Sequence, residues 1–420
     1  MTRSSPAPVS IPVSSRIGGF TYAIRNIVAE ARNVEAAGTR VRYLNIGDPI
    51  AFGFETPPHL IEAVSRAMRD GHNGYTASVG IPDAREAVAA DYTRRGMPVS
   101  PDHVVLTSGT SEGIELALGA LADDGDEVLV PVPTYPLYTA VLAKLGARAV
   151  YYKLDPANGW QPDLDDIRRQ LSPSTRALVV IDPNNPTGAV YPEATRRALL
   201  ALASEHNVPI LADEVYGELG YDGAVPPMAS LDPDAPVISF SSLSKAYLAP
   251  GWRAGWMAVG RSTRMAEVLG AIRKLADGRL CSPGPMQHAI TAALTGDRSH
   301  QQSFIAALKE RADISIQRLN AIDGITCVRP QSAFYAMPKV DLPQGVTDED
   351  YIVALLGATG VLCVYGSGFG LPSAGGFFRV VFLAKPSELH DIYDLIAEFT
   401  PRYVAEARAG RRRGAVSASS

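Results

Sequence analysis

The sequence of 420 residues contains little cysteine. Its three cysteines stand far apart, and none belongs to a CxxC pair: Cys281, Cys327 and Cys363. An odd number of widely spaced thiols argues against a disulfide framework and against a thiolate zinc site, and it is typical of a reducing compartment. The seven histidines also lack the spacing of metal ligands. We therefore predict no bound metal and a cytoplasmic location.

Long apolar runs and an excess of positive charge are also missing. No apolar stretch approaches the ~20 residues that a membrane-spanning helix needs, and residues 1–16 have no apolar core of the signal-peptide type. The net charge is −5 and the pI is near 5.9, so the chain has no global positive field that would collect phosphates. These absences predict neither a membrane nor a nucleic-acid partner.

The chain does contain a regular alternation of short apolar runs and longer amphipathic stretches. The apolar runs are rich in Val and Ile and cover residues 103–107, 126–131, 147–153, 176–181, 208–213, 235–240 and 255–260. Helical spacing of apolar residues appears between them, for example in 111–123 and 192–207. This alternation predicts an α/β fold with a mostly parallel, seven-stranded sheet sandwiched by helices.

The pattern becomes looser in the last third of the chain. Strands are predicted in 333–340, 360–365 and 377–384, a bridging helix in 309–324 and a final helix in 387–406. We expect a large domain of residues 56–300 and a smaller α+β domain built from both termini, residues 16–55 and 301–408. The Ser- and Pro-rich segment 1–15 and the basic tail 409–420 are expected to be disordered, because they offer little apolar surface to bury.

Polar residues follow four of the predicted strands. The motif SGTSEG begins at Ser108, DPNNPTG contains Asn185, Asp213 is followed by Tyr216, and Lys245 comes soon after the run ending at residue 240. In an open α/β sheet, ligands bind beyond the carboxyl ends of the strands. These residues are therefore candidates for one common site.

Each of these features also has an ordinary structural explanation. SGTSEG is a suitable helix N-cap, NNPTG has the composition of a turn, a carboxylate is favoured at a helix N-terminus, and a loop lysine is normally solvated. Their joint occurrence at successive strand ends favours a functional reading. Pyridoxal phosphate needs a lysine for its covalent link, an acidic partner for its pyridine nitrogen and a phosphate site.

Longer stretches carry a resemblance to a known family. They include YAIRNIVAEARNVEAAGTRVRYLNIGDP, VPVPTYPLY, the run from WQPDL to DPNNPTGAVY, ILADEVY, SLSKAYLAPGWRAGW, RLCSPGPMQHAI and GSGFG before FFRVVFL. In this collinear order, over residues 20–400, the chain resembles the fold-type I aminotransferases of the aspartate aminotransferase superfamily, and within them the bacterial and archaeal alanine aminotransferases. The resemblance implies an enzyme with pyridoxal 5'-phosphate as its cofactor.

The resemblance also implies roles for individual residues around the cofactor ring. Lys245 matches the lysine that binds the cofactor covalently, and Asp213 matches the partner of the pyridine nitrogen. Asn185 and Tyr216 match the groups that hydrogen-bond to the ring's phenolic oxygen. Tyr135 matches the aromatic residue that stacks on the ring.

Further matches concern the phosphate and the substrate. The residues matching phosphate ligands are Gly109, Thr110, Ser111, Ser242 and Arg253. Tyr75 matches a tyrosine that reaches the phosphate from the neighbouring subunit, so a homodimer with shared active sites is implied. Arg379 matches the arginine that binds the substrate α-carboxylate, beside Asn185, and Gly47 matches a backbone contact to the same carboxylate.

The implied reaction is a ping-pong transfer of the amino group of L-alanine to 2-oxoglutarate, giving pyruvate and L-glutamate. A five-carbon dicarboxylate requires a second cation, for which Arg25 and Arg279 are candidates. Either can instead be an ordinary surface or structural arginine.

Three other functions are compatible with parts of the sequence. The same cofactor scaffold supports other amino-donor preferences, as well as lyase and oxidase reactions. A non-enzymatic sensor normally carries an added DNA-binding module, for which the ~20 residues before YAIRN are too few. The third is a nicotinamide-dependent dehydrogenase. GSGFG at 366–370 resembles a dinucleotide-binding fingerprint, yet it leads into LPSAGG and not into a predicted helix.

Overall fold

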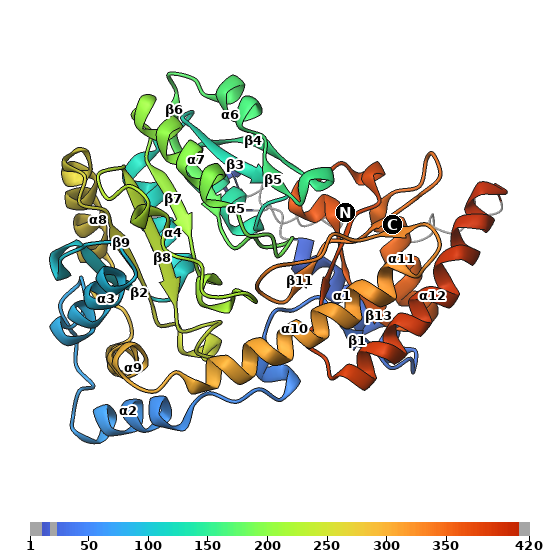
Figure 1. The fold of residues 1–420 in the computed structure, drawn as a ribbon, viewed down its shortest axis with the longest axis horizontal. Coiled ribbons are helices and arrows are strands. Elements are labelled where there is room, and N and C mark those ends of the chain that lie inside the picture. Colours follow the sequence, from blue (N-terminus) through green and yellow to red (C-terminus); the bar gives the residue numbers. More distant parts are fainter. Residues whose placement is uncertain (1–10, 17–22, 411–420) are drawn as a thin grey trace, which may run out of the picture.

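The computed structural model describes residues 11–16 and 23–410, which form two lobes joined by one long helix (Figure 1). The larger lobe contains a sheet in the order β2-β9-β8-β7-β6-β3-β4-β5. Its strands are β2 (Val104–Thr107), β3 (Glu127–Val132), β4 (Arg148–Asp155), β5 (Gln161–Pro162), β6 (Thr175–Ile181), β7 (Ile210–Asp213), β8 (Val237–Ser242) and β9 (Gly255–Val259).

The predicted sheet is confirmed in type, and one strand is added to it. Strands β3, β4, β6, β7 and β8 pair in parallel, whereas β9 runs antiparallel to both of its neighbours. The sheet has eight strands and not the predicted seven, because the two-residue β5 pairs antiparallel with the end of β4. A strand this short, ending in a proline, produces no apolar run that sequence reasoning can detect.

Helices cover both faces of this sheet (Figure 1). One face packs against α4 (Thr110–Leu121), α5 (Pro136–Leu145) and α8 (Ala266–Gly278). The other face packs against α3 (Pro82–Arg94), α6 (Leu164–Gln170), α7 (Glu193–Glu205) and α9 (Gly284–Thr295), with α2 (Pro58–Arg69) outside α9. In β6, alternate side chains enter opposite cores: Val179 joins one and Val180 the other. Both faces are buried, which explains the near-continuous apolar run of this strand.

The smaller lobe combines segments from the two ends of the described chain. Two of its sheets have two strands each: β1 (Arg42–Tyr43) pairs with β13 (Val361–Leu362), and β10 (Ile325–Thr326) pairs with β12 (Lys339–Val340). In the third sheet the middle strand β15 (Phe378–Val381) pairs with β11 (Tyr335–Ala336) on one side and β14 (Val364–Tyr365) on the other. The covering helices are α1 (Ala23–Ala36), α11 (Asp348–Thr359) and α12 (Pro386–Arg408). The parallel β1–β13 pair therefore brings the N-terminal part of the chain into the C-terminal lobe.

Several local predictions for this lobe need correction. Residues 333–340 were expected to form one strand, but β11 and β12 are separated by Met337 and Pro338 and belong to different sheets. Residues 360–365 likewise divide into β13 and β14. The final helix is confirmed. The segments 1–10 and 411–420 lie outside the described residues, and among the described helices none is long and apolar enough to cross a membrane.

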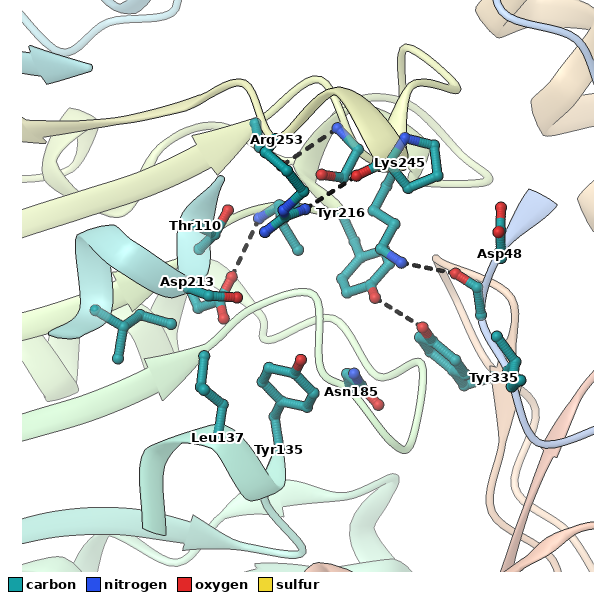
Figure 2. A pocket seen from close by; sticks show the side chains of 18 of the residues that line it. Asp48, Thr110, Tyr135, Leu137, Asn185, Asp213, Tyr216, Lys245, Arg253 and Tyr335 are labelled. Carbon is teal, nitrogen blue, oxygen red and sulfur yellow. Dashed lines mark hydrogen bonds between the residues drawn. The ribbon is translucent and has the colours of Figure 1, made fainter. Parts of the chain in front are cut away.

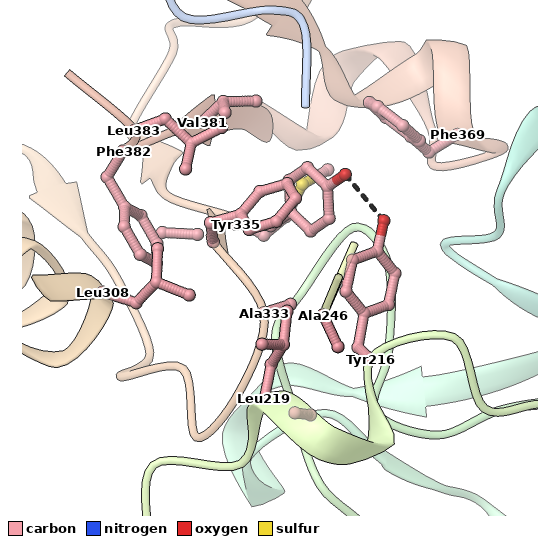
Figure 3. Close-up of a cluster of buried hydrophobic side chains, with 14 of the residues drawn as sticks. Tyr216, Leu219, Ala246, Leu308, Ala333, Tyr335, Phe369, Val381, Phe382 and Leu383 are labelled. Atoms are coloured by element: carbon pink, nitrogen blue, oxygen red, sulfur yellow. Dashed lines mark hydrogen bonds between the residues drawn. The ribbon is translucent and has the colours of Figure 1, made fainter. Parts of the chain in front are cut away.

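The two lobes are held together by α10 (Ser299–Asn320), which runs from the large lobe along the small one and packs on α12 (Figure 1). Buried side chains continue from one lobe into the other (Figure 3). In this cluster Leu219 and Ala246 of the large lobe lie near Leu308 of α10 and Phe382 after β15. Shared apolar burial of this kind keeps the two lobes in contact.

Candidate active site

A pocket of about 350 Å³ lies where the carboxyl ends of β6, β7 and β8 meet the small lobe (Figure 2). Parallel strands end at the same edge of a sheet, so residues far apart in sequence are brought together there. The pocket is lined by Asn45, Ile46, Gly47, Asp48, Thr110, Ser111, Ile114, Tyr135, Leu137, Asn185, Asp213, Val215, Tyr216, Ser242, Ser244, Lys245, Pro250, Arg253, Tyr335 and Arg379.

Lys245 lies in the loop after β8, and its side chain enters the pocket (Figure 2). Its Nζ donates a hydrogen bond of 2.7 Å to the carbonyl oxygen of Gly47. Burial lowers the pKa of the amine to about 8; the charge of Asp48 opposes this shift, and those of Arg379 and Arg253 add to it. The amine therefore titrates near neutral pH, which a solvated lysine does not do.

Asp213 is the last residue of β7 and lies on the floor of the same pocket. The hydroxyl of Tyr138 donates to its Oδ2 at 3.2 Å, and the amide of Val215 donates to its Oδ1 at 3.5 Å. Burial raises the pKa of this carboxyl group to about 6, although both hydrogen bonds and the charge of Lys245 favour the ionised form. A buried carboxylate of this kind is stabilised by a cationic partner within the pocket.

The N-terminus of α4 forms a cradle beside Arg253. Gly109 precedes the helix with a φ of +77°, and a Cβ there would lie 2.4 Å from a guanidinium nitrogen of Arg253. The guanidinium is oriented by hydrogen bonds to the carbonyl oxygens of Pro250, at 3.0 Å, and Ser108, at 3.2 Å. Within the described part of the chain, the buried Oγ1 of Thr110 has no hydrogen-bond partner. Helix dipole, cation and unpaired hydroxyl together suit an anion.

Arg379 enters the pocket from β15 of the small lobe and is only 2% exposed. Its guanidinium donates to Asn185 Oδ1 at 3.1 Å and to the carbonyl oxygen of Asn45 at 2.6 Å. The rings of Tyr335 and Phe369 each lie 4.8 Å from its Cζ. This arrangement fixes the planar fork that suits a carboxylate.

Comparison with known proteins agrees with this arrangement. Residues 40–393 match the family model for aminotransferase class I and II. The chain belongs to this family. It is 38% identical over 400 residues to glutamate-pyruvate aminotransferase AlaA of Haemophilus influenzae, covering 93% of this chain and 98% of that protein. Alanine aminotransferase of Mycobacterium tuberculosis is 39% identical, with 93% and 92% covered. The solved alanine aminotransferase of Pyrococcus furiosus has a TM-score of 0.90 at 40% identity, with 93% and 100% covered.

Class I and II aminotransferases use pyridoxal phosphate, and the residues of this aminotransferase fit that cofactor. The unpaired Thr110 hydroxyl and the Arg253 guanidinium are suitable ligands for its phosphate. Asp213 can hold its pyridine nitrogen, and Lys245 can bind it covalently. Tyr135, Asn185, Ser111 and Ser242 also line the pocket and are within the cofactor's reach for the roles expected of them.

Three residues of the expected site do not line the pocket. Gly109 lies next to it, at the start of α4 beside Arg253. Tyr75 lies outside it, with 84% of its surface exposed. Arg279 was a candidate second carboxylate ligand, but its Nε lies 3.2 Å from Glu112 and it donates to the carbonyl oxygen of Leu106 at 2.6 Å. Glu112 in turn accepts from the amide of Ser108. Arg279 therefore supports the cradle loop from behind. The side chain of Arg25, in α1, lies outside the described residues.

Sequence reasoning missed other pocket residues. Asn45 and Asp48 flank Gly47 in the motif NIGDP, which drew attention only to its glycine. Tyr335 lies in a short strand of the small lobe and gave no strand-end signal. Its hydroxyl is 2.8 Å from that of Tyr216. GSGFG forms a 3-10 helix, Gly366–Phe369, and no dinucleotide loop, as its context had predicted.

The Gly109 geometry predicts that Gly109→Ala weakens cofactor binding roughly tenfold, equivalent to ~1.4 kcal/mol, because Arg253 must move. Equilibrium titration of the apo-protein with pyridoxal phosphate measures this. Gly125→Ala is the matched control: its φ of +85° carries the same backbone strain, but no atom lies within 4 Å of the added Cβ. Equal losses in both variants would contradict the proposed role of the contact with Arg253.

The environment of Lys245 predicts a second effect. Asp48→Asn removes the negative charge that holds the pKa of Lys245 up, so that pKa should fall below about 8. The hydrogen bond from Ile50 N to residue 48 can persist, because Asn caps as well as Asp. The pH dependence of Lys245 acylation in the apo-protein, followed by mass spectrometry, checks the shift. Asp70→Asn, an exposed carboxylate at the end of α2, should leave it unchanged.

Proposed function

We propose that this aminotransferase moves the amino group of L-alanine to 2-oxoglutarate, giving pyruvate and L-glutamate in two half-reactions. The observation that supports it best is the partly buried Lys245 amine, which faces the same pocket as buried Asp213 and Arg379. The substrate choice is supported by the relatives named above, which carry alanine or glutamate-pyruvate aminotransferase in their names over more than 90% of this chain.

The cofactor, when bound, supplies a protonated ring that withdraws electrons from the substrate Cα. Asp213 keeps the ring nitrogen protonated, since its carboxylate is ionised above a pKa of about 6. Lys245, with a pKa of about 8, could take the proton from Cα and deliver it to the cofactor carbon bonded to the substrate nitrogen, as transfer of the amino group requires. Arg379 holds the substrate α-carboxylate through the edge that now faces Asn185 and Asn45. The backbone of Gly47 lines the same pocket and would contact that carboxylate, as the family match implies.

We also propose that the active enzyme is a homodimer with shared sites and is cytoplasmic. Tyr75 is 84% exposed in the single chain, so its side chain is free to reach a second subunit. Its matched role in the family is to reach the phosphate in the neighbouring subunit's site. The three cysteines are unpaired, which supports the predicted compartment; cell fractionation would test it.

A half-reaction screen tests the substrate proposal. Holoenzyme is mixed with each amino acid in turn, and the visible cofactor band is followed as it converts to the amino form. We expect alanine and glutamate to convert it. Lys245→Ala should retain cofactor but lose turnover by at least roughly 10²–10⁴-fold, whereas Lys144→Ala, on the surface of α5, should behave as wild type. Conversion by neither amino acid would defeat the substrate proposal and leave the family assignment intact.

Shared sites are tested by mixing two inactive variants, Lys245→Ala and Tyr75→Ala. In the mixed dimer, one site receives an intact Lys245 from one chain and an intact Tyr75 from the other. Activity should therefore recover to up to about a quarter of wild type after statistical exchange of an isologous dimer. Recovery no greater than the sum of the separate variants, despite proven exchange, would show that Tyr75 serves its own chain or none.

A further inference from the structure

The hydroxyl groups of Tyr216 and Tyr335 form a buried pair at the boundary between the lobes (Figure 3). Their oxygens are 2.8 Å apart, and the residues are 3% and 2% exposed. Tyr216 follows β7 in the large lobe, whereas Tyr335 begins β11 in the small lobe. Both line the pocket (Figure 2). The pair therefore connects the cofactor side of the pocket with the carboxylate side.

The segment before Tyr335 is tied firmly to the large lobe. The amide of Gln331 donates to the carbonyl oxygen of Gly188 at 2.8 Å, and Ser332 Oγ donates to that of Tyr216 at 3.2 Å. The hydroxyl of Tyr221 donates to the carbonyl oxygen of Ala333 at 2.7 Å. These bonds place the Tyr335 ring without help from its own hydroxyl.

The Tyr335 hydroxyl also has little freedom to move. A Cβ on Gly47 would lie 2.2 Å from this oxygen, so the backbone of Gly47 closes one side of it. The ring of Tyr335 lies edge-on to that of Tyr216, with centroids 5.5 Å apart, and faces the Arg379 guanidinium at 4.8 Å. The hydroxyl is therefore held against Tyr216 from several sides.

The direction of the shared hydrogen bond follows from the role of Tyr216. Either hydroxyl can donate as the pair stands. If Tyr216 gives its only proton to the cofactor's phenolic oxygen, its own oxygen can only accept from Tyr335. The two phenols then form a chain in which each bond polarises the next.

We propose that Tyr335 is a positioning residue that donates to Tyr216 and thereby strengthens the hydrogen bond that Tyr216 donates to the cofactor. The inference rests on the proposed function and on the role that the family resemblance implies for Tyr216, a hydrogen bond to the cofactor's phenolic oxygen. Other titratable groups acting on Tyr216 are Asp213 of β7 and Tyr135 before α5. Through this chain of hydrogen bonds, a hydroxyl group of the small lobe acts on the cofactor side of the pocket.

The test compares Tyr335→Phe, Tyr216→Phe and the double variant as holoenzymes without substrate. The readout is the pH midpoint at which the visible cofactor band changes, because a weaker bond to the anionic ring oxygen raises that midpoint. Tyr216→Phe should raise it by roughly 1–2 pH units. Tyr335→Phe should raise it by about a tenth to a third of that amount, since polarisation adds about 10–30% per bond. The Tyr335→Phe effect should vanish in the Tyr216→Phe background.

Tyr351→Phe is the matched control. It also removes a buried hydroxyl pair in the small lobe, with Thr400 at 2.8 Å, but it does not line the pocket. It should leave the midpoint unchanged while lowering thermal stability about as much as Tyr335→Phe. A merely structural role for Tyr335 would give similar behaviour of these two variants in both measurements.

Three results would overturn the inference. The first is an unchanged midpoint in Tyr335→Phe while Tyr216→Phe shifts it. The second is an equal Tyr335→Phe shift with and without Tyr216, which would show that Tyr335 acts elsewhere. The third is no shift in Tyr216→Phe, which would also remove the proposed role of Tyr216. None of these bears on the choice of alanine, because no substrate is present in the measurement.

Discussion

The partly buried amine of Lys245 is the feature on which the rest of the site depends. An ammonium group taken out of water is costly unless other charges and hydrogen bonds stabilise it. Here the Gly47 carbonyl oxygen accepts a hydrogen bond of 2.7 Å from the amine, and the charge of Asp48 opposes the loss of the proton. Burial still prevails, and its pKa falls to about 8. The pocket therefore keeps a nucleophilic amine available near neutral pH, beside a carboxylate whose pKa is shifted the other way.

That balance requires both lobes. The large lobe supplies Lys245 and Asp213 from strand ends, but the carbonyl that holds the amine belongs to the N-terminal segment leading out of β1. Arg379 reaches the pocket from β15 and contacts the same segment through Asn45. Separation of the lobes would expose the amine to water and return its pKa towards that of an ordinary lysine. The apolar cluster along α10 is thus a condition for the chemistry as well as for stability.

Charged groups outside the pocket contribute to the site by fixing the position of a loop that borders it. Arg279 illustrates this: as an isolated cation before an apolar stretch it was a reasonable candidate for a substrate ligand. Its guanidinium is instead engaged by Glu112 and by the carbonyl oxygen of Leu106, and Glu112 also receives the amide of Ser108. Arg279 and Glu112 therefore hold the loop at Ser108, before α4, in place before a ligand binds. This reduces the conformational entropy that is lost on binding.

Sequence patterns were enough to predict the sheet except for the two-residue β5, the helices that cover it, and the strand-end residues Lys245, Asp213 and Asn185. These features depend on local sequence. Strands buried on both faces are recognisable as continuous apolar runs, and the carboxyl ends of parallel strands lie at one edge of the sheet. The contact of Tyr335 with Tyr216 and the ion pair of Arg279 with Glu112 emerged only from the folded structure. Each contact joins residues more than a hundred positions apart in the chain, the tyrosine pair across the two lobes and the ion pair within the large lobe, and no local pattern records such packing.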